Sequence, residues 1–430
     1  MNDGDPGILL IGNDGSGPDP SLGAGACIAR TGRFRTALER GGFRVTVSSP
    51  GNTPARVHDV RKVLHGEAWS CVVAISPHPA ELAVMAGTDR PLWIDMNGMH
   101  PAEVHLAGDA AGDPRLEMIR ILSLENTLLS RGDHFSAPSS RQTSAIMGEL
   151  YLLGRLDAGD RGVIPVSAIQ HCALEAPLST GPSGPESPFP VVSTGSFNSW
   201  FDVETLFHGL EHAMERNGRI TFVSSGGSVP FAEEQYRRFS DLVSGSRFRS
   251  RFTLAGWVDR EELERIQDGA GAAVYADIPC GESLLGARTR VLDWISRGIP
   301  VVCTMGAEIS ETVGGRGMGL TVPQGDHAAL GEALVRLASA PGEAEAVRRA
   351  QEEWRRGDGR IDSVFRPLLE WCRDPVRLTP GQLCPPTVAR LSSRAYRMAV
   401  LREIVRRKGA GSAAGFLAAS MAGKLRKRSR

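Results

Sequence analysis

A repeated alternation of short apolar runs and longer amphipathic stretches is the feature of this sequence that most constrains its fold. The short runs are rich in Val and Ile and end at Gly, Asn, Ser or Pro, as the strands of a parallel sheet do. The alternation runs to about residue 169, breaks, and restarts at residue 191. We therefore expect an α/β protein with two Rossmann-like, doubly wound parallel-sheet domains.

The pattern predicts where the elements of each domain lie. Strands of the first domain are expected at 7–14, 43–50, 70–77, 91–98, 133–140 and 162–169, with helices near 25–41, 57–66, 78–87, 101–109, 114–131 and 139–156. Strands of the second are expected at 191–196, 220–227, 252–258, 272–277, 300–304 and 319–323, with helices near 202–216, 231–243, 259–269, 285–297, 306–313 and 326–340.

A segment rich in Pro, Gly and Ser separates the two patterns. We expect residues 176–190 to be a linker, because they show no periodicity. The predicted divisions are an N-terminal domain (1–175), this linker, a C-terminal domain (191–345), a helical segment (346–386) and a basic tail (387–430). Two such domains leave a cleft at the carboxyl ends of both sheets, which is where ligands bind in this kind of protein.

The basic tail has two interpretations. It contains twelve Lys or Arg and one acidic residue, Glu403, and its apolar residues recur at helical spacing. An amphipathic basic helix can make peripheral contact with the anionic inner face of a membrane. The alternative is a solvated charged helix whose apolar side packs on the protein.

The composition argues against several other classes of protein. Lys plus Arg and Asp plus Glu number 49 each, so no overall field favours nucleic acid as a partner. No stretch reaches the roughly 18 apolar residues of a membrane span, and the N-terminus does not resemble a signal peptide. The seven cysteines are scattered without a CxxC pair, which fits free thiols in a reducing compartment. We therefore expect a cytoplasmic location.

Residues 280–302, CGESLLGARTRVLDWISRGIPVV, place several charges directly beside a strand that is expected to be buried. The N–H groups at the start of the helix in this stretch would favour a phosphate. Arg288 and Arg290 lie on its first turn, where guanidinium groups could clamp a diphosphate, although Arg290 could equally pair with a nearby carboxylate. Asp293 could accept hydrogen bonds from a ribose diol. The stretch therefore predicts a pocket for a nucleoside diphosphate.

This stretch resembles the C-terminal half of GT-B fold glycosyltransferases of the family 4 type. Their E-x7-E helix, followed by G-x-P-V-V, is similar to VLDWISRGIPVV, with Asp293 in place of the second glutamate. The usual spacing would put the first glutamate at position 285, which is Leu, so Glu282 takes its place across a longer loop. Three further segments resemble a bacterial subgroup or the family in general, namely 139–156, 193–210 and 319–334.

The resemblance implies an activity and partners. The expected reaction moves a sugar from a nucleotide diphosphate sugar to a small-molecule (natural-product) or glycan acceptor, with retention of configuration and without a metal or other cofactor. Glu282 would contact the sugar, Arg288 the diphosphate and Asp293 the ribose. The sequence has no DxD carboxylate pair at a strand end and no His/Cys cluster, which agrees with the expectation of no metal site.

Other candidate residues each have an ordinary alternative. Asp95 ends a buried strand and His100 follows in a loop, so both are catalytic candidates or plain polar residues. Asn198 is expected to shape the pocket floor, Gly226 to form a diphosphate-binding or base-binding turn, and Thr289 to be a further residue that binds the nucleotide sugar.

The glycine-rich run at 12–25 follows the first expected strand. Gly15 and Gly17 could let its backbone approach a phosphate or the donor sugar. Two prolines follow, so a helix cannot open there and the run is not a dinucleotide-binding fingerprint. The run is either a mobile loop on the acceptor side or a plain long turn. Arg33, on the next expected helix, faces the cleft or lies on a solvated face.

One departure from the family leaves other functions open. Family members commonly carry an Arg and a Lys just after the first strand of the C-terminal domain, whereas residues 195–209 contain neither. Arg288 and Arg290 would then replace them, or the chain is a catalytically silent partner subunit. A third alternative is an enzyme of the same fold that couples a nitrogen acceptor.

Overall fold

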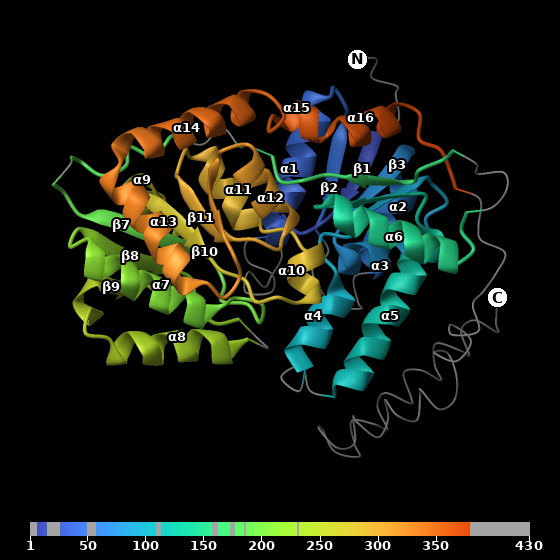
Figure 1. Cartoon of the computed structure of the whole chain (residues 1–430). Helices are drawn as coiled ribbons and strands as arrows, with labels where there is room; N and C mark the ends of the chain where they lie inside the picture. Colours follow the sequence, from blue (N-terminus) through green and yellow to red (C-terminus); the bar gives the residue numbers. More distant parts are fainter. Residues whose placement is uncertain are drawn as a thin grey trace.

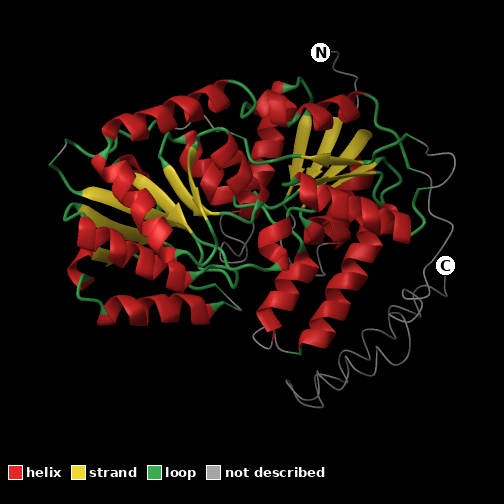
Figure 2. Ribbon diagram, in the orientation of Figure 1, coloured by secondary structure: helices red, strands yellow, loops and turns green. Residues whose placement is uncertain are grey.

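The structure, a computed structural model, describes residues 7–14, 26–49, 57–108, 113–156, 162–172, 177–184, 186–229 and 232–378. Within these ranges lie two six-stranded parallel sheets, each with helices packed on its faces (Figures 1 and 2). Both sheets were expected from the sequence. The predicted Gly15, Gly17 and basic tail (387–430) lie outside the described residues.

The N-terminal sheet has the strand order β2-β1-β3-β4-β5-β6. Its strands are β1 (Gly7–Ile11), β2 (Val45–Ser48), β3 (Trp69–Ile75), β4 (Leu92–Asp95), β5 (His134–Ala137) and β6 (Val166–Ala168). The connecting helices are α1 (Ala26–Arg40), α2 (Val57–Gly66), α3 (Pro77–Ala86), α4 (His100–Ala107), α5 (Pro114–Arg131) and α6 (Ser140–Leu152). Helices cover both faces, which is why β1 and β3 are almost continuous apolar runs. Each predicted strand and helix of this domain is confirmed.

The C-terminal sheet has the order β12-β11-β10-β7-β8-β9. Its strands are β7 (Phe189–Thr194), β8 (Ile220–Ser225), β9 (Phe252–Leu254), β10 (Ala272–Tyr275), β11 (Val301–Thr304) and β12 (Gly319–Val322). The predicted helices are confirmed as α7 (Val203–Arg216), α8 (Glu233–Gly245), α9 (Arg260–Asp268), α11 (Thr289–Ser296), α12 (Glu308–Gly315) and α13 (His327–Ser339). A short helix, α10 (Gly281–Leu285), lies where a loop was expected.

The chain returns to the N-terminal domain after the second sheet is complete. Helix α14 (Pro341–Arg356) runs along the C-terminal domain, whereas α15 (Ile361–Val364) and α16 (Arg366–Arg373) lie against the first domain (Figure 1). Phe365 packs edge-on against Phe34 of α1, with ring centroids 4.8 Å apart, inside one of the cores of the N-terminal domain. The last helices thus stabilise the domain that begins the chain.

The predicted linker is described at residues 177–184 and 186–190; residues 177–184 form neither helix nor strand, and 189–190 are the first residues of β7. It is bonded to the C-terminal domain: Ser179 N–H donates to the Arg297 carbonyl (2.8 Å), and Thr180 N–H donates to Asp268 Oδ1 (3.0 Å). Across the described residues, no helix has the length and apolarity to cross a membrane. The cysteines in these ranges are free thiols.

Candidate functional site

The two domains meet where α10, α11 and α12 of the second face α1, α4 and α6 of the first (Figure 1). Ser139, which caps α6, donates its hydroxyl to the Leu285 carbonyl at the end of α10 (2.6 Å). Glu308, the first residue of α12, accepts from the Ser140 hydroxyl at 2.6 Å. Direct hydrogen bonds therefore hold the strand-end edge of one domain to the other.

A buried group of charges lies at the end of β10, on the C-terminal side of this interface. Arg288, only 4% exposed, precedes α11 and donates through Nε to Asp277 Oδ2 (2.7 Å) and through Nη1 to Glu282 Oε1 (3.0 Å). The Tyr275 hydroxyl donates to the other oxygen of Asp277. We call Tyr275, Asp277, Glu282, Arg288 and Arg290 the β10 cluster. Asp277 was not among the residues predicted from the sequence, although it closely follows the buried strand β10.

Arg290 completes the β10 cluster from the first turn of α11. Its Nη2 donates to the Ser196 carbonyl (2.6 Å), and its guanidinium lies 5.3 Å from the ring centroid of Tyr275 and 5.6 Å from that of Phe201. A cation over aromatic faces is stabilised by the ring quadrupoles, which offsets part of the cost of its burial. These contacts therefore hold the Arg290 side chain in one position.

Three buried polar atoms of the β10 cluster have no hydrogen-bond partner among the described residues: Glu282 Oε2, Arg288 Nη2 and Arg290 Nη1. Buried polar atoms are nearly always paired, because an unpaired one costs about 1–3 kcal/mol. These atoms offer one hydrogen-bond acceptor and two cationic donors. The cluster could thus bind a molecule that carries a hydroxyl and anionic oxygens.

Burial also sets the protonation of the β10 cluster. It raises the pKa of Glu282 to about 7, although the nearby Arg288 cation acts in the opposite direction. It raises the pKa of Asp277 as well, again opposed by Arg288. Glu282 can therefore change its charge near neutral pH, which is unusual for a glutamate.

His100 approaches this region from the N-terminal domain. It begins α4, which packs against α10 and so brings His100 to the same interface as Glu282. Burial acts to lower its pKa, but the Glu125, Glu103 and Glu282 carboxylates outweigh it and raise the pKa overall. Its Nδ1 lies 3.8 Å from Glu125 Oε1. His100 was expected to act together with Asp95, and Glu282 was a separate catalytic candidate; a catalytic role for either His100 or Glu282 stays a prediction.

Asp95 lies at the end of β4, as expected, but its carboxylate is 0% exposed. Arg30 donates to both oxygens, through Nε to Oδ2 and through Nη2 to Oδ1, each at 2.6 Å. The Ser136 hydroxyl donates to Oδ1 at 2.7 Å. Asp95 is thus fully engaged in anchoring α1 to the sheet. Its expected contact with the reacting sugar stays a prediction that this geometry does not support.

Asp293 and Thr289, both on α11, contact the N-terminal domain. Arg33 of α1 donates through Nη2 to Asp293 Oδ1 at 2.5 Å, and the Asp293 side chain remains 40% exposed. The buried His171 lies between Arg33 and Thr289, with a 2.9 Å contact from its Nε2 to Thr289 Oγ1. Arg33 is buried and bonded to the second domain, so the alternative in which it lies on a solvated face is wrong. His171 was not among the sequence candidates.

The turns after β7 and β8 come very close together. Gly226 has a φ of 106°, and a Cβ at this position would collide with the Gly195 carbonyl, so only glycine fits. Asn198 is half-buried in the first of these turns, and its carbonyl accepts from Phe201 N–H at 3.0 Å. The predicted contacts of Gly226 and Asn198 with a nucleotide stay predictions.

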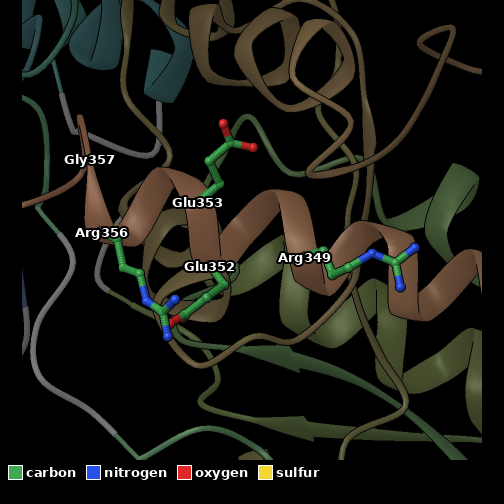
Figure 3. Close-up of a pocket in the computed structure, with 5 residues that line it drawn as sticks. All are labelled: Arg349, Glu352, Glu353, Arg356 and Gly357. Atoms are coloured by element: carbon green, nitrogen blue, oxygen red, sulfur yellow. The ribbon is translucent and has the colours of Figure 1, made fainter.

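A separate surface hollow lies on α14. Figure 3 shows its lining residues, namely Arg349, Glu352, Glu353, Arg356 and Gly357. Glu352 already pairs with Arg356 at 2.6 Å and Arg349 lies 3.7 Å from Glu345, so these charges pair along their own helix. We therefore place the candidate site at the β10 cluster and not here. Among the residues that the structure describes, no cluster of His, Cys, Asp and Glu could hold a metal ion.

Comparison with known proteins relates this geometry to a family. Residues 189–340 match the family described as Glycosyl transferases group 1. No curated protein matches the chain at the level of sequence.

Solved structures with the same architecture include sucrose-phosphate synthase from Thermosynechococcus elongatus (TM-score 0.61, 17% identity, covering 86% of this chain and 98% of that one). Anabaena HepE in complex with UDP and glucose has a TM-score of 0.57 at 14% identity, covering 86% and 100%. A UDP-forming α,α-trehalose-phosphate synthase from Burkholderia vietnamiensis has a TM-score of 0.59 at 13% identity, covering 86% and 98%.

At these identities the likeness establishes the fold, and the match to residues 189–340 covers the sheet that carries the β10 cluster. The chain therefore has the fold of these glycosyltransferases, and its residues 189–340 match the group 1 glycosyl transferases.

Proposed function

We propose that this chain transfers a glycosyl group from a nucleoside diphosphate sugar to an acceptor, with retention of configuration at the anomeric carbon. The observation that carries the proposal is the set of three unpaired buried atoms in the β10 cluster, counted among the described residues. They lie in the domain that matches the group 1 glycosyl transferases. A diphosphate sugar offers both anionic oxygens for the arginines and hydroxyls for the carboxylate.

Each residue then has a role that its chemistry supports. Arg288 Nη2 and Arg290 Nη1 would bind the diphosphate together with the first N–H groups of α11, Glu282 would accept from a sugar hydroxyl, and Asp293 from the ribose. As the bond between the anomeric carbon and the phosphate oxygen breaks, negative charge grows on the leaving diphosphate. The fixed arginines would stabilise that charge more in the transition state than in the ground state.

The acceptor side of the proposal follows from the resemblance to retaining glycosyltransferases. The acceptor hydroxyl would attack the anomeric carbon on the face that the diphosphate leaves, and its proton would pass to a leaving phosphate oxygen. No protein nucleophile is needed in this scheme. The acceptor would be a natural-product scaffold or a cell-envelope glycan bound by the N-terminal domain. UDP-sugars are the first donors to test, because HepE was solved with UDP and glucose and the Burkholderia synthase is UDP-forming.

The test is release of nucleoside diphosphate from UDP-, GDP-, ADP- and dTDP-sugars, without added metal, measured by mass spectrometry with and without candidate acceptors. The proposal expects turnover with one nucleotide class. Glu282→Gln should lower kcat/KM by about 100-fold, because it removes a charged partner at the reacting sugar. Glu352→Gln, on the outer face of α14, is the matched control and should leave turnover unchanged. Binding of every sugar without turnover would contradict the proposal.

A catalytically silent partner subunit is the second candidate. It is favoured by the absence of Lys and Arg from residues 195–209 and by the two carboxylates that already pair with Arg288. Such a subunit would bind a nucleotide sugar without consuming it. Loss of product in cells that carry a normally folded Glu282→Ala variant would exclude it.

A further inference from the structure

Arg33 makes an ion pair that joins the two domains. It lies on α1 of the N-terminal domain, is buried, and donates through Nη2 to Asp293 Oδ1 of α11 at 2.5 Å. Asp95, by contrast, receives its arginine from within its own domain. The pair formed by Arg33 therefore depends on how the domains are docked.

His171 extends this contact to a second residue of α11. A guanidinium can only donate, so Arg33 Nη1 donates to His171 Nδ1, and the imidazole is the neutral tautomer with its proton on Nε2. That proton is donated to Thr289 Oγ1, 2.9 Å away. Arg33 thus contacts α11 directly at Asp293 and indirectly at Thr289, the first residue of the helix.

The pair leaves part of Asp293 available. Its side chain remains 40% exposed, and among the described residues its second oxygen forms no hydrogen bond. A carboxylate that is fixed at one oxygen and open at the other is oriented to accept a hydroxyl. Without Arg33, the side chain could rotate, and a ligand would have to order it on binding.

We propose that Arg33 and His171 are positioning residues of the nucleotide subsite, holding the Asp293 carboxylate and the first turn of α11 in the orientation that accepts the ribose hydroxyls. This inference rests on the proposed function, in which Asp293 contacts the ribose. It makes the N-terminal domain a determinant of donor binding and not only of acceptor binding. Donor affinity is thereby tied to the docked arrangement of the two domains.

The test is a calorimetric titration of the full chain with UDP, GDP and ADP and with their 2′-deoxy and 3′-deoxy counterparts. Wild type should prefer the ribonucleotide. Arg33→Met should weaken ribonucleotide binding by about tenfold and bring the ratio of deoxy to ribo Kd close to one, because a positioned charged acceptor is lost. Arg35→Met, at an exposed position of the same helix, is the control and should keep the wild-type ratio.

A general loss of structure would weaken ribo and deoxy ligands equally and leave their ratio unchanged, so the ratio isolates the positioning role. Should Arg33→Met fail to fold, Arg33→Lys keeps the charge, cannot reach Asp293 and His171 together, and is expected to give an intermediate ratio. An unchanged ratio in a folded Arg33 variant, or no ribose preference in wild type, would overturn the inference and leave the proposed function standing. Failure of wild type to bind any nucleotide would overturn both.

Discussion

The N-terminal and C-terminal domains each bury an arginine–carboxylate pair near the carboxyl ends of the sheet strands. In the first, Arg30 and Ser136 together occupy both oxygens of Asp95. In the second, Arg288 bonds one oxygen of Glu282 and leaves the other unpaired within the described ranges. Asp95 ends β4, whereas Glu282 lies on α10 beyond the end of β10, and the two groups differ in how complete their hydrogen bonding is.

This difference separates a structural group from a candidate binding group. A buried ion pair costs several kcal/mol to desolvate, and only complete hydrogen bonding offsets that cost. The Asp95 group meets this condition within the protein, so it holds α1 against the sheet. The β10 cluster does not meet it among the described residues, and a bound diphosphate sugar would supply the missing partners.

The largest effect on stability is expected for Asp95, both of whose oxygens accept hydrogen bonds. Asp95→Asn removes one charge of a buried pair and leaves Arg30 uncompensated, so it should lower the free energy of unfolding by about 3–5 kcal/mol. Urea denaturation followed by circular dichroism measures this loss. A change below about 1 kcal/mol would mean that the pair does not anchor α1.

A pH dependence of stability is the next largest expected effect. It comes from Glu282, which has one oxygen without a hydrogen-bond partner among the described residues. Burial raises the pKa of Glu282 from an ordinary 4.5 to about 7, so between these values the folded state binds more protons than the unfolded state. The free energy of unfolding should therefore fall as pH rises through this window, by about 3 kcal/mol in total, and level off above it. Glu282→Gln should remove this part of the slope.

Glu149 provides a comparison for that titration, because burial also raises its pKa to about 7. Glu149→Gln should remove a similar slope in the absence of ligand. Binding of a nucleotide sugar should alter only the part of the pH dependence of stability that comes from Glu282. If the slope of Glu282→Gln equals that of wild type, Glu282 is not the titrating group.

Glu308 is an intermediate case, because a carboxylate of one domain is completed by the other. It accepts from Ser140 N–H (3.1 Å), the Ser140 hydroxyl (2.6 Å), Arg141 N–H (3.0 Å) and Gln170 Nε2 (3.2 Å). Glu308→Ala should weaken domain docking by about 1–2 kcal/mol, as loss of a helix cap does. Faster hydrogen exchange at the amides of Ser140 and Arg141 would report it, and unchanged exchange would count against this contact.

The smallest effect is expected on the outer face of α14. Glu352 pairs with Arg355 and Arg356, both at 2.6 Å, but solvent reaches these side chains. Glu352→Gln should change the free energy of unfolding by less than about 1 kcal/mol. A loss comparable with that of Asp95→Asn would show that burial does not explain the ranking of these groups.

The sequence predicted most of the fold because its strands are apolar runs bounded by turn residues, a local signal. Helix α10 was not predicted because it lacks such a local signal. It has five residues, too few for helical periodicity, and the thiol of Cys280 caps it in place of a typical N-cap residue. Local sequence patterns also could not predict that α15 and α16 pack against the first domain.

The candidate site was predictable only in part. Glu282, Arg288 and Asp293 could be found because their charges stand beside an apolar strand within one short stretch. Arg33 could not be identified as the partner of Asp293, because 260 positions separate them and no periodicity links them. The role of Asp95 likewise depends on Arg30, 65 positions away. Long-range pairing of charges decides which polar residue is structural and which is available.

The most direct test of this account is a crystal structure of the chain with a bound nucleoside diphosphate sugar that the protein does not turn over. The account predicts phosphate oxygens within hydrogen-bond distance of Arg288 Nη2 and Arg290 Nη1, and a sugar hydroxyl at Glu282 Oε2. A ligand bound elsewhere, with these three atoms paired to other parts of the protein, would contradict it.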